Sequence, residues 1–295
     1  MKHIAIIATL TMLLTAAGRV QAEDENLFQE LVVQQLTAIS DSIAKPVSEI
    51  FSSGVTGGWF RSADAHGLLG FDIGIRAMFV RVPDNKSDVF DSAGVSYFPV
   101  GLLQASLGLP MDFEFTLRGF NVNYEEAKIS FFGAGLKKNF NSMIPVPMFP
   151  DVAAFLAYEK FRATYTTFDI DATQFFNLNY PVNAEVDAGD LINSSHFSMG
   201  VIVSKKLSLL VFSIQPYLGL SWDHSKMKYK WTVNNTNPAV PNLTLPLAVS
   251  SEISTNATRL TLGLDVSPFP FIHVFGDYSI SKYNQFSAGL AFSFR

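Results

Sequence analysis

The stretch that decides the fold is Leu210–Asp223, LVFSIQPYLGLSWD, in which two kinds of residue alternate. The residues from Leu210 to Trp222 at every second position are apolar or proline, whereas Ser213, Gln215 and Asp223 belong to the other set. A period of two gives a β-strand one apolar and one polar face. The run is also longer than the usual strand of about five or six residues.

The same alternation recurs in three further stretches, 71–79, 259–266 and 286–295. A strand of about eleven residues tilted by roughly 40° rises about 28 Å, close to the apolar band of an outer-membrane barrel. The second face carries Gly, Ser and Thr with scattered charges, which is typical of a narrow lumen. Soluble sandwiches usually have shorter strands. The pattern therefore favours a membrane barrel.

The predicted fold is all-β, a transmembrane antiparallel β-barrel of about 10 strands (range roughly 8–14), preceded by a short helical segment. The expected strands are 69–82, 97–107, 112–121, 126–137, 152–164, 195–204, 208–232, 254–266, 271–281 and 285–295. With the amino terminus in the periplasm, the connections after odd strands are mostly the longer ones and are expected outside the cell. Aromatic residues near strand ends are expected at the membrane interfaces: Phe98, Tyr158, Trp222, Trp231 and Tyr278.

The chain divides into three parts, of which residues 1–22 are predicted to be a signal peptide. An apolar run over 4–17 is followed by Val20-Gln21-Ala22, small residues of the kind that a signal peptidase reads. The run is short for a membrane-spanning helix, which needs about 20 residues. Residues 67–295 form the predicted barrel, and export by the signal peptide would take it to the cell outer membrane.

Residues 23–66 form the third part, an amino-terminal amphipathic helical segment. Its apolar residues fall at helical spacing, and Lys45-Pro46 provides a stop. Those residues are Phe28, Leu31, Val32, Leu36, Ile39 and Ile43. Three arrangements remain open: the segment plugs the lumen, packs as a cap at the periplasmic mouth, or forms a loosely ordered tail.

Composition excludes several function classes. The chain has no cysteine, so a disulfide scaffold, a thiolate metal site and a cysteine nucleophile are ruled out. Its 21 Lys and Arg against 26 Asp and Glu give a net charge of -5, which makes nucleic acid a poor partner. In Asp223-His224-Ser225, strand neighbours point to opposite faces, so His224 cannot contact both partners. With no hydrolase, metalloprotease, phosphate-loop or dinucleotide motif, the chain is predicted to be non-enzymatic, without catalytic residues, metal or cofactor.

Charged residues on the predicted strands are the candidate site. On the lipid face each would cost up to about 2–4 kcal/mol near the midplane, so they are expected to face inward and to pair. The lumen-lining candidates are Asp72, Arg76, Glu114, Arg118, Arg259, Asp265, Asp277 and Arg295. They either fill and neutralise a narrow interior or form a selectivity lining for a small solute.

Several motifs resemble an uncharacterised family of bacterial outer-membrane β-barrel proteins over about residues 40–295. The motifs are Lys45-Pro46, the run GGWFRSA at 57–63, Gly70-Phe71-Asp72, the proline-rich stretch 145–151 and Ala288-Gly289 near the carboxy terminus. The resemblance implies a barrel but no activity, and it assigns no functional residues. Fatty-acid-channel-type barrels are a more distant comparison, and the Asn-Pro-Ala triplet of that class occurs here only at 237–239, in a predicted outer loop.

The sequence thus predicts an outer-membrane barrel that is a narrow or plugged conduit for small or apolar solutes, or a structural envelope protein. Two alternatives remain: a barrel enzyme acting on membrane lipids, and a secreted soluble β-protein that binds an apolar ligand. The expected partners are outer-membrane lipid, small or apolar solutes, and the barrel-assembly machinery, which would contact the carboxy-terminal strand. The solute, the oligomeric state and the state of the lumen do not follow from the sequence.

Overall fold

The computed structural model describes residues 45–83, 96–124, 127–143, 149–165, 167–171, 183–187, 192–209, 212–235 and 247–294. The predicted signal peptide, the predicted helix before Lys45 and the candidate Arg295 lie outside these residues. No helix in the described ranges is long and apolar enough to span a membrane.

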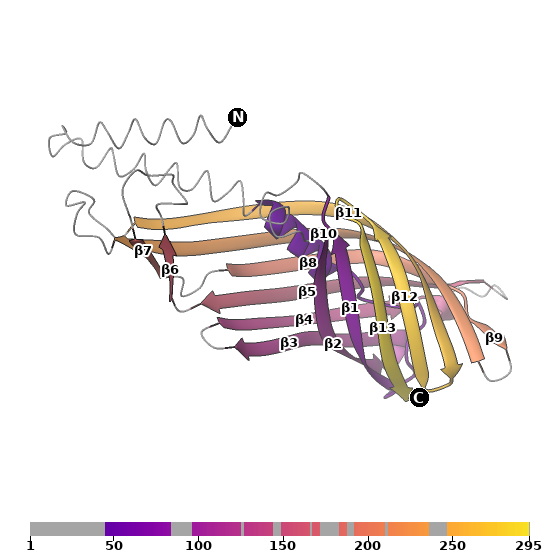
Figure 1. Ribbon diagram of the computed structural model, residues 1–295. Coiled ribbons are helices and arrows are strands. Elements are labelled where there is room, and N and C mark those ends of the chain that lie inside the picture. The colour runs from indigo at the N-terminus through magenta and orange to yellow at the C-terminus, as the bar shows by residue number, and fades with distance from the viewer. Residues whose placement is uncertain are drawn as a thin grey trace, which may run out of the picture.

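Ten antiparallel strands form a closed ring (Figure 1). They are β1 (Phe71–Arg81), β2 (Tyr97–Leu109), β3 (Phe113–Tyr124), β4 (Ala127–Asn139), β5 (Asp151–Tyr165), β8 (Ile192–Ser204), β10 (Phe212–Asn235), β11 (Leu247–Phe269), β12 (Ile272–Ile280) and β13 (Gln285–Phe294). Each strand pairs with the next in this order, and β13 pairs back with β1 from Phe71↔Phe294 to Val80↔Gln285. The prediction of an all-β barrel with about ten strands is confirmed.

Three short strands, two 3-10 turns and a helix over 45–56 are the other described elements. β9 (Leu207–Leu209) pairs with the start of β10, whereas β7 (Asn183–Asp187) pairs with its far end and in turn with β6 (Thr167–Asp171). The turns are η2 (Pro110–Asp112) and η3 (Asn141–Met143). We had predicted loops at β6 and β7, because these polar stretches carry no apolar period.

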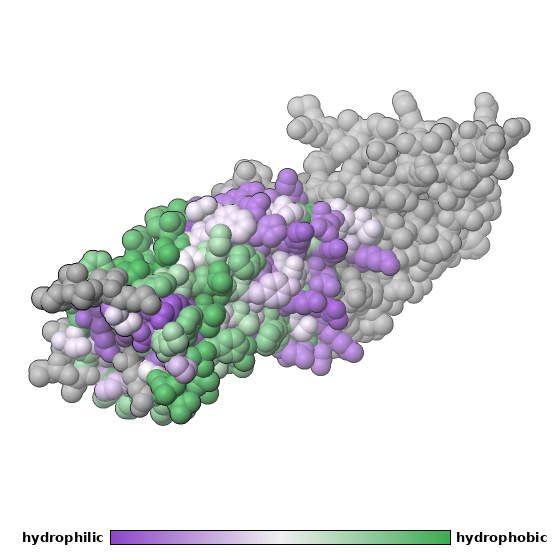
Figure 2. All heavy atoms as spheres, turned by 180° about the vertical axis from the view of Figure 1, so that it is seen from behind, coloured by the Kyte–Doolittle hydropathy of each residue, from purple (hydrophilic) through white to green (hydrophobic). Residues whose placement is uncertain are grey.

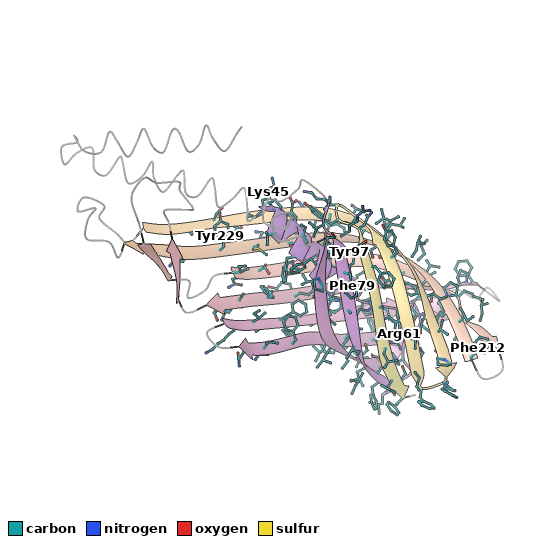
Figure 3. All side chains as sticks on the ribbon, viewed as in Figure 1. Lys45, Arg61, Phe79, Tyr97, Phe212 and Tyr229 are labelled. Atoms are coloured by element: carbon teal, nitrogen blue, oxygen red, sulfur yellow. The ribbon has the colours of Figure 1, made fainter. Side chains whose placement is uncertain are left out.

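The two faces of the ring follow the predicted alternation. Apolar side chains such as Leu262, which is 50% exposed, point outward, whereas Arg259 on the same strand is 2% exposed and points inward. Figure 3 shows the side chains that project from the outer surface, among them Phe212 at the end of β10. Figure 2 shows these hydrophobic residues as a green face bordered by a purple hydrophilic band.

One expected interfacial aromatic is wrong. Phe98 is in phase with the buried Val100 and Leu102 on β2, so it points inward and lies 6.2 Å from Phe51, measured between ring centroids. Tyr158, Trp222 and Tyr278 are exposed on the outer surface, and the side chain of Trp231 lies outside the described residues. A position at a strand end does not decide the face of a side chain, which is set by the phase of the alternation.

The ring encloses the chain that precedes it, which we call the lumen segment, residues 45–70. It begins with a helix over 45–56, and Ile50 in this helix packs against Val80, Val82 and Tyr283 at one mouth. It ends at Gly70, whose amide hydrogen-bonds Gly67 near Gly108 and Phe294 at the other mouth. The segment therefore passes through the whole barrel.

The two mouths differ in their connections. At the mouth where the lumen segment enters, residues 82–96 link β1 to β2, residues 166–191 lie between β5 and β8, and residues 236–246 link β10 to β11. At the mouth where it ends, η2 alone links β2 to β3, and two residues link β11 to β12. We call these the long-loop mouth and the short-turn mouth. The lumen segment thus runs from the long-loop mouth to the short-turn mouth.

The outward face provides a direct test of membrane burial. Leu262→Arg places a charge in the middle of the apolar face and is expected to destabilise the folded barrel in vesicles by about 2–4 kcal/mol. Ser254→Arg is the matched control, because Ser254 is exposed on the same strand and face, beyond the apolar residues. Its expected effect is within about 0.5 kcal/mol. Urea unfolding, read by loss of gel heat-modifiability, measures both, and equal effects would contradict a membrane barrel.

Candidate functional site: a filled lumen

The helix of the lumen segment is fixed at the long-loop mouth. The Tyr283 hydroxyl donates to the Glu49 carboxylate at 3.1 Å, and the Lys282 ammonium lies 2.6 Å from the same carboxylate. Burial together with the Glu49 charge raises the pKa of Tyr283 to about 12, so this hydroxyl keeps its proton at neutral pH. Tyr283 and Lys282 lie in the turn between β12 and β13. The turn between β12 and β13 therefore holds the first turns of the helix.

The carboxy-terminal end of the helix points into the barrel, where its last carbonyls have no partners within the helix. Two arginines of the wall bind this end. Arg118 on β3 donates to the carbonyls of Val55 and Gly57, the latter at 2.8 Å. Arg259 on β11 donates to the Ser53 carbonyl at 2.9 Å and to the Thr56 hydroxyl at 2.8 Å. Cations at this end also complement the negative end of the helix dipole.

Each of these arginines also binds a carboxylate of the wall. Arg118 pairs with Glu159 on β5, and Arg259 pairs with Asp223 on β10 at 3.0 Å. The four side chains are at most 3% exposed, so the charges are shielded from water. A buried charge is tolerated only when it is paired and hydrogen-bonded. The pairs therefore supply the cations that bind the helix end at neutral net charge.

The aromatic pair Trp59–Phe60 follows the helix and packs against the wall. The Arg118 guanidinium lies 3.7 Å from the centre of the Trp59 ring, in cation–π contact. A Cβ atom at Gly135 on β4 would lie 2.8 Å from that ring, so the wall needs a glycine there. At Gly58 the backbone takes a φ of 66°, which glycine adopts at little cost.

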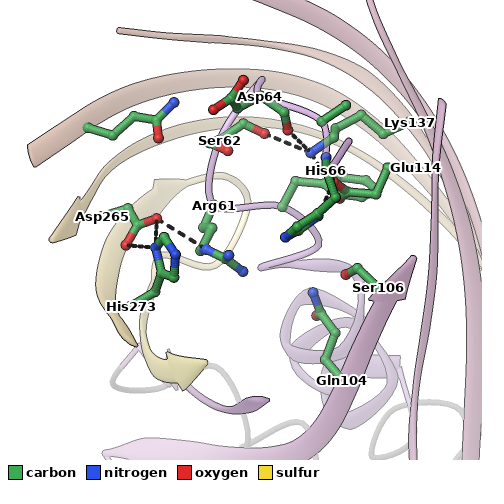
Figure 4. A pocket seen from close by; sticks show the side chains of 13 residues that line it. Arg61, Ser62, Asp64, His66, Gln104, Ser106, Glu114, Lys137, Asp265 and His273 are labelled. Atoms are coloured by element: carbon green, nitrogen blue, oxygen red, sulfur yellow. Dashed lines mark hydrogen bonds and ion pairs between the residues drawn. The ribbon is translucent and has the colours of Figure 1, made fainter. Parts of the chain in front are cut away.

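A second polar cluster surrounds residues 61–66 of the lumen segment, towards the short-turn mouth (Figure 4). Arg61 pairs with Asp72 on β1 and, at 3.1 Å, with Asp265 on β11. The Lys137 ammonium on β4 binds the carbonyls of Ser62 and Asp64 at 3.2 and 2.6 Å.

Carboxylates of the wall complete this lower cluster. Glu114 on β3 lies 2.9 Å from the Lys137 ammonium and 2.7 Å from Nδ1 of His66. The cluster thus repeats the arrangement around the helix end, with one cation held between a wall carboxylate and the carbonyls of the lumen segment.

The space left inside this cluster is small. A cavity of about 20 Å3, counted as the volume open to the centre of a water molecule, lies between Arg61, His66, Gln104 and His273. One water needs about 10–15 Å3 on this scale. The cavity therefore has room for about one ordered water and not for an organic solute.

Seven of the eight predicted lumen candidates are buried, at 2–3% exposure; Arg295 is outside the described residues. The structure pairs two of them with each other, Arg76 and Asp277 at 3.7 Å. The others have partners that we did not predict, so their joint role as a solute lining stays a prediction. The missed members of the site are Trp59, Arg61, His66, Lys137, Glu159, His196, Asp223 and His273.

The signals for the missed wall residues were present in the alternation. Asp223 occupies the polar phase of the stretch first quoted, and Glu159 lies two positions from the inward-facing Ala157. Trp59 and Arg61 belong to the GGWFRSA run, which marked a family resemblance but carried no structural role. Their position inside the barrel could not follow from period, because this part of the lumen segment is neither helix nor strand.

The buried His273 does not form a catalytic triad. Ser267 and Asp265 both contact Nδ1 of His273, at 2.8 and 2.9 Å, whereas a triad needs its serine and its carboxylate on different ring nitrogens. His224 points outward, away from the buried Asp223 and Ser225, as predicted. The described residues contain no group of three or more side chains suited to hold a metal ion.

The fold and this interior define a class, a closed β-barrel filled by a segment of its own chain. By sequence, the chain belongs to the Family of unknown function (DUF6588), which matches over residues 1–93 and 87–294. A search of curated proteins finds no match.

Solved structures similar to this chain include two autotransporter domains. The beta domain of the Bordetella autotransporter Brka is 9% identical, with 77% of this chain and 100% of that chain covered, at a TM-score of 0.42. The translocator domain of autotransporter NalP from Neisseria meningitidis is 9% identical, with 90% and 99% covered, at 0.39. The outer membrane protease OmpT from Escherichia coli is 10% identical, with 77% and 96% covered, at 0.35.

Loss of one wall arginine tests how the lumen segment is held. Arg118→Met leaves Glu159 buried without its partner and two carbonyls without donors, so we expect a loss of about 3–5 kcal/mol in the free energy of unfolding. Arg118→Met/Glu159→Leu should be less destabilised than the single variant, because it removes the isolated charge. Urea titration of the folded protein measures both.

Arg81→Met is the control for that comparison, since Arg81 is exposed at the end of β1, and its effect should stay within about 0.5 kcal/mol. An Arg118→Met variant as stable as Arg81→Met would show that the lumen contacts contribute little.

Proposed function

We propose that this protein is a sealed outer-membrane β-barrel, a structural envelope protein that anchors a protruding β-ribbon rather than an open diffusion channel. One observation carries the proposal: among the described residues the lumen segment runs through the barrel from mouth to mouth, and the cavity beside its residues 60–66 measures only about 20 Å3. Side chains alone nearly fill an eight-stranded barrel, so a ten-stranded one has room for one further chain segment.

The outer surface supports location in a membrane. Large apolar side chains are exposed all around the ring, among them Ile75 at 56%, Leu103 at 60% and Leu156 at 52%. A soluble protein of this size rarely exposes an apolar surface so extensive. The inward charges and the outward apolar residues together match the inverted pattern of a barrel in lipid.

The ribbon is the part of β10 and β11 that extends beyond β8, which pairs with β10 as far as Tyr229↔Ile192. β10 continues from Lys230 to Asn235, roughly 20 Å at about 3.3 Å per residue, and pairs with β11 up to Val233↔Leu247 and with β7 from Thr232↔Asp187. Between the apolar face and the ribbon, the outward residues of β11 are polar and exposed, such as Ser254 and Asn256. Figure 1 shows both strands running beyond β12 and β13. In our proposal this end, with the long loops, faces the outside of the cell.

A conduit for small solutes is the second candidate. The observation in its favour is the set of charged groups around the cavity. Passage would require the lumen segment to leave its place, with loss of the contacts of Arg118, Arg259 and Lys137 to its backbone. The number of these buried contacts is the reason that the sealed state is the better proposal.

Orientation is testable by cysteine labelling, because the natural chain has no cysteine. Lys45 is exposed at the long-loop mouth, and Met111 is 75% exposed at the short-turn mouth. On intact cells, a polyethylene-glycol maleimide too large for porins should label Lys45→Cys and leave Met111→Cys unlabelled. After the outer membrane is permeabilised, both should react. The reverse pattern would show that the barrel has the opposite orientation in the membrane. Labelling of both variants on intact cells would contradict membrane insertion.

Conductance separates the two candidate functions. In planar bilayers the natural protein is expected to show no stable channel. Deletion of residues 45–56 should open one, because it empties the part of the lumen next to the long-loop mouth. Should the deletion fail to fold, Phe51→Ala/Val55→Ala removes apolar packing of the helix and should raise the frequency of openings. Arg81→Met is the control. Stable channels in the natural protein would overturn the sealed state.

A further inference from the structure

We propose that the barrel displays its own amino-terminal chain on the cell surface, because the lumen segment carries that chain to the far side of the membrane. The residues concerned are those that precede Lys45, and we call them the displayed chain. The inference rests on the proposed membrane location and orientation. It adds a function to them, in which the barrel holds a stretch of its own polypeptide outside the cell.

An even number of strands places both ends of the ring at the same mouth. β1 begins at Phe71 and β13 ends at Phe294, and these two residues are paired. They lie at the short-turn mouth, with Gly70 beside them. A chain that entered β1 directly would have its amino terminus at this mouth, which is the periplasmic side in the proposed orientation. The expectation of a periplasmic amino terminus follows from this strand count alone.

The lumen segment reverses the side on which the chain begins. It starts at Lys45, which is exposed at the long-loop mouth, where Ile50 packs against Val80 and Tyr283. Figure 3 shows Lys45 at the start of the helix and Arg61 deeper inside the ring. Because the polypeptide is continuous, the residue before Lys45 lies at the long-loop mouth as well. The displayed chain is therefore separated from the beginning of β1 by the whole length of the barrel.

Contacts along its length fix the lumen segment in this direction. Val55 in the helix is fully buried and packs in a cluster with Met78 on β1. Towards the short-turn mouth, the Ala63 amide donates to the Ser204 hydroxyl on β8 at 2.9 Å, and the Ala63 carbonyl accepts from the Asn139 amide on β4 at 2.8 Å. Wall residues thus hold the backbone near both mouths and between them. The lumen segment is a fixed part of the folded barrel.

The filled interior keeps the displayed chain on the side of the long loops. A second stretch of polypeptide beside the lumen segment would need about 4.8 Å, the spacing of neighbouring strands. Among the described residues, the cavity beside residues 60–66 has room for about one water. The lipid around the barrel is no alternative, since irregular backbone in hydrocarbon leaves its N–H and C=O groups unpaired.

The displayed chain leaves the barrel at the mouth that carries the ribbon. Both strands of the ribbon contact the helix of the lumen segment. Asp223 on β10 accepts a hydrogen bond from the Thr56 hydroxyl at 3.3 Å, and Arg259 on β11 donates to the Ser53 carbonyl. Figure 1 shows the helix beside these two strands. Any sequence joined before Lys45 is therefore held outside the cell by the buried contacts of the lumen segment.

Protease accessibility on intact cells tests the display in the full-length protein. An epitope tag is inserted after Asp24 and the recognition site of a sequence-specific protease after Asp41. The protease is too large for porins. Added to intact cells, it should remove the tag from most of the folded protein, whereas the barrel stays in the membrane and remains heat-modifiable on gels.

Two matched variants carry the same protease site elsewhere. In the turn between β11 and β12, after Pro270, the site should be cleaved only when the outer membrane is permeabilised. In the connection between β10 and β11, after Pro241, it should be cleaved on intact cells and so reports the orientation independently of the displayed chain.

Protection of the amino-terminal site on intact cells overturns the display. If the site after Pro241 is cleaved in the same experiment, the proposed orientation stands without it. If only the site after Pro270 is cleaved, the orientation is reversed as well, and cleavage of all three sites contradicts membrane insertion. Should the insertion prevent folding, Thr37→Cys replaces it. Its labelling by the large maleimide on intact cells supports the display, and its protection while Lys45→Cys is labelled overturns it.

Discussion

Three cations of the barrel wall, Arg118, Lys137 and Arg259, each bind a wall carboxylate and backbone carbonyls of the lumen segment at the same time. This shared coordination is the constraint on which the interior depends. The carboxylate makes the buried cation tolerable, and the cation satisfies carbonyls that would otherwise be unpaired. Because backbone atoms are the ligands, the contacts fix the path of the segment largely independently of its side chains. A barrel without this segment would leave these three cations without their carbonyl ligands.

The outer surface follows a different physical rule, and the two rules explain the overall architecture. Around the ring, apolar side chains such as Ile75 and Leu103 face outward, while charges are confined to the interior or to the region beyond the apolar face. The ribbon formed by β10 and β11 begins further along, after Tyr229, where β8 ends. The outer face of these strands thus changes from an apolar wall to polar residues before the ribbon begins.

Much of the barrel could be predicted from the sequence, because period two reports directly on two-faced strands. Alternation predicts the outward position of Phe286, Leu262 and Ile75. The cost of a charge on the lipid face predicts the inward position of Arg76, Arg118 and Arg259, and the structure agrees with both. The polar first part of β11 was missed, since a strand with solvent on its outer face has no apolar phase. Ion-pair partners could not be predicted, because the pairing of Arg118 with Glu159 depends on which strands are neighbours and on register. The path of residues 57–70 has no periodic signal at all.

The contact between Trp59 and the wall has a consequence for how this family can diverge. The indole ring occupies volume that side chains at Gly133 and Gly135 would need. The three positions therefore share one space, although Trp59 lies about 75 residues before the two glycines. A substitution at Gly135 is compatible with the fold only in a background where Trp59 has become smaller, whereas a side chain at Gly133 would press on Glu159 and Arg118 as well. We expect correlated replacement at these positions among relatives, with a bulkier residue on β4 accompanying a smaller one in the lumen. Homologous sequences that keep the tryptophan should keep both glycines.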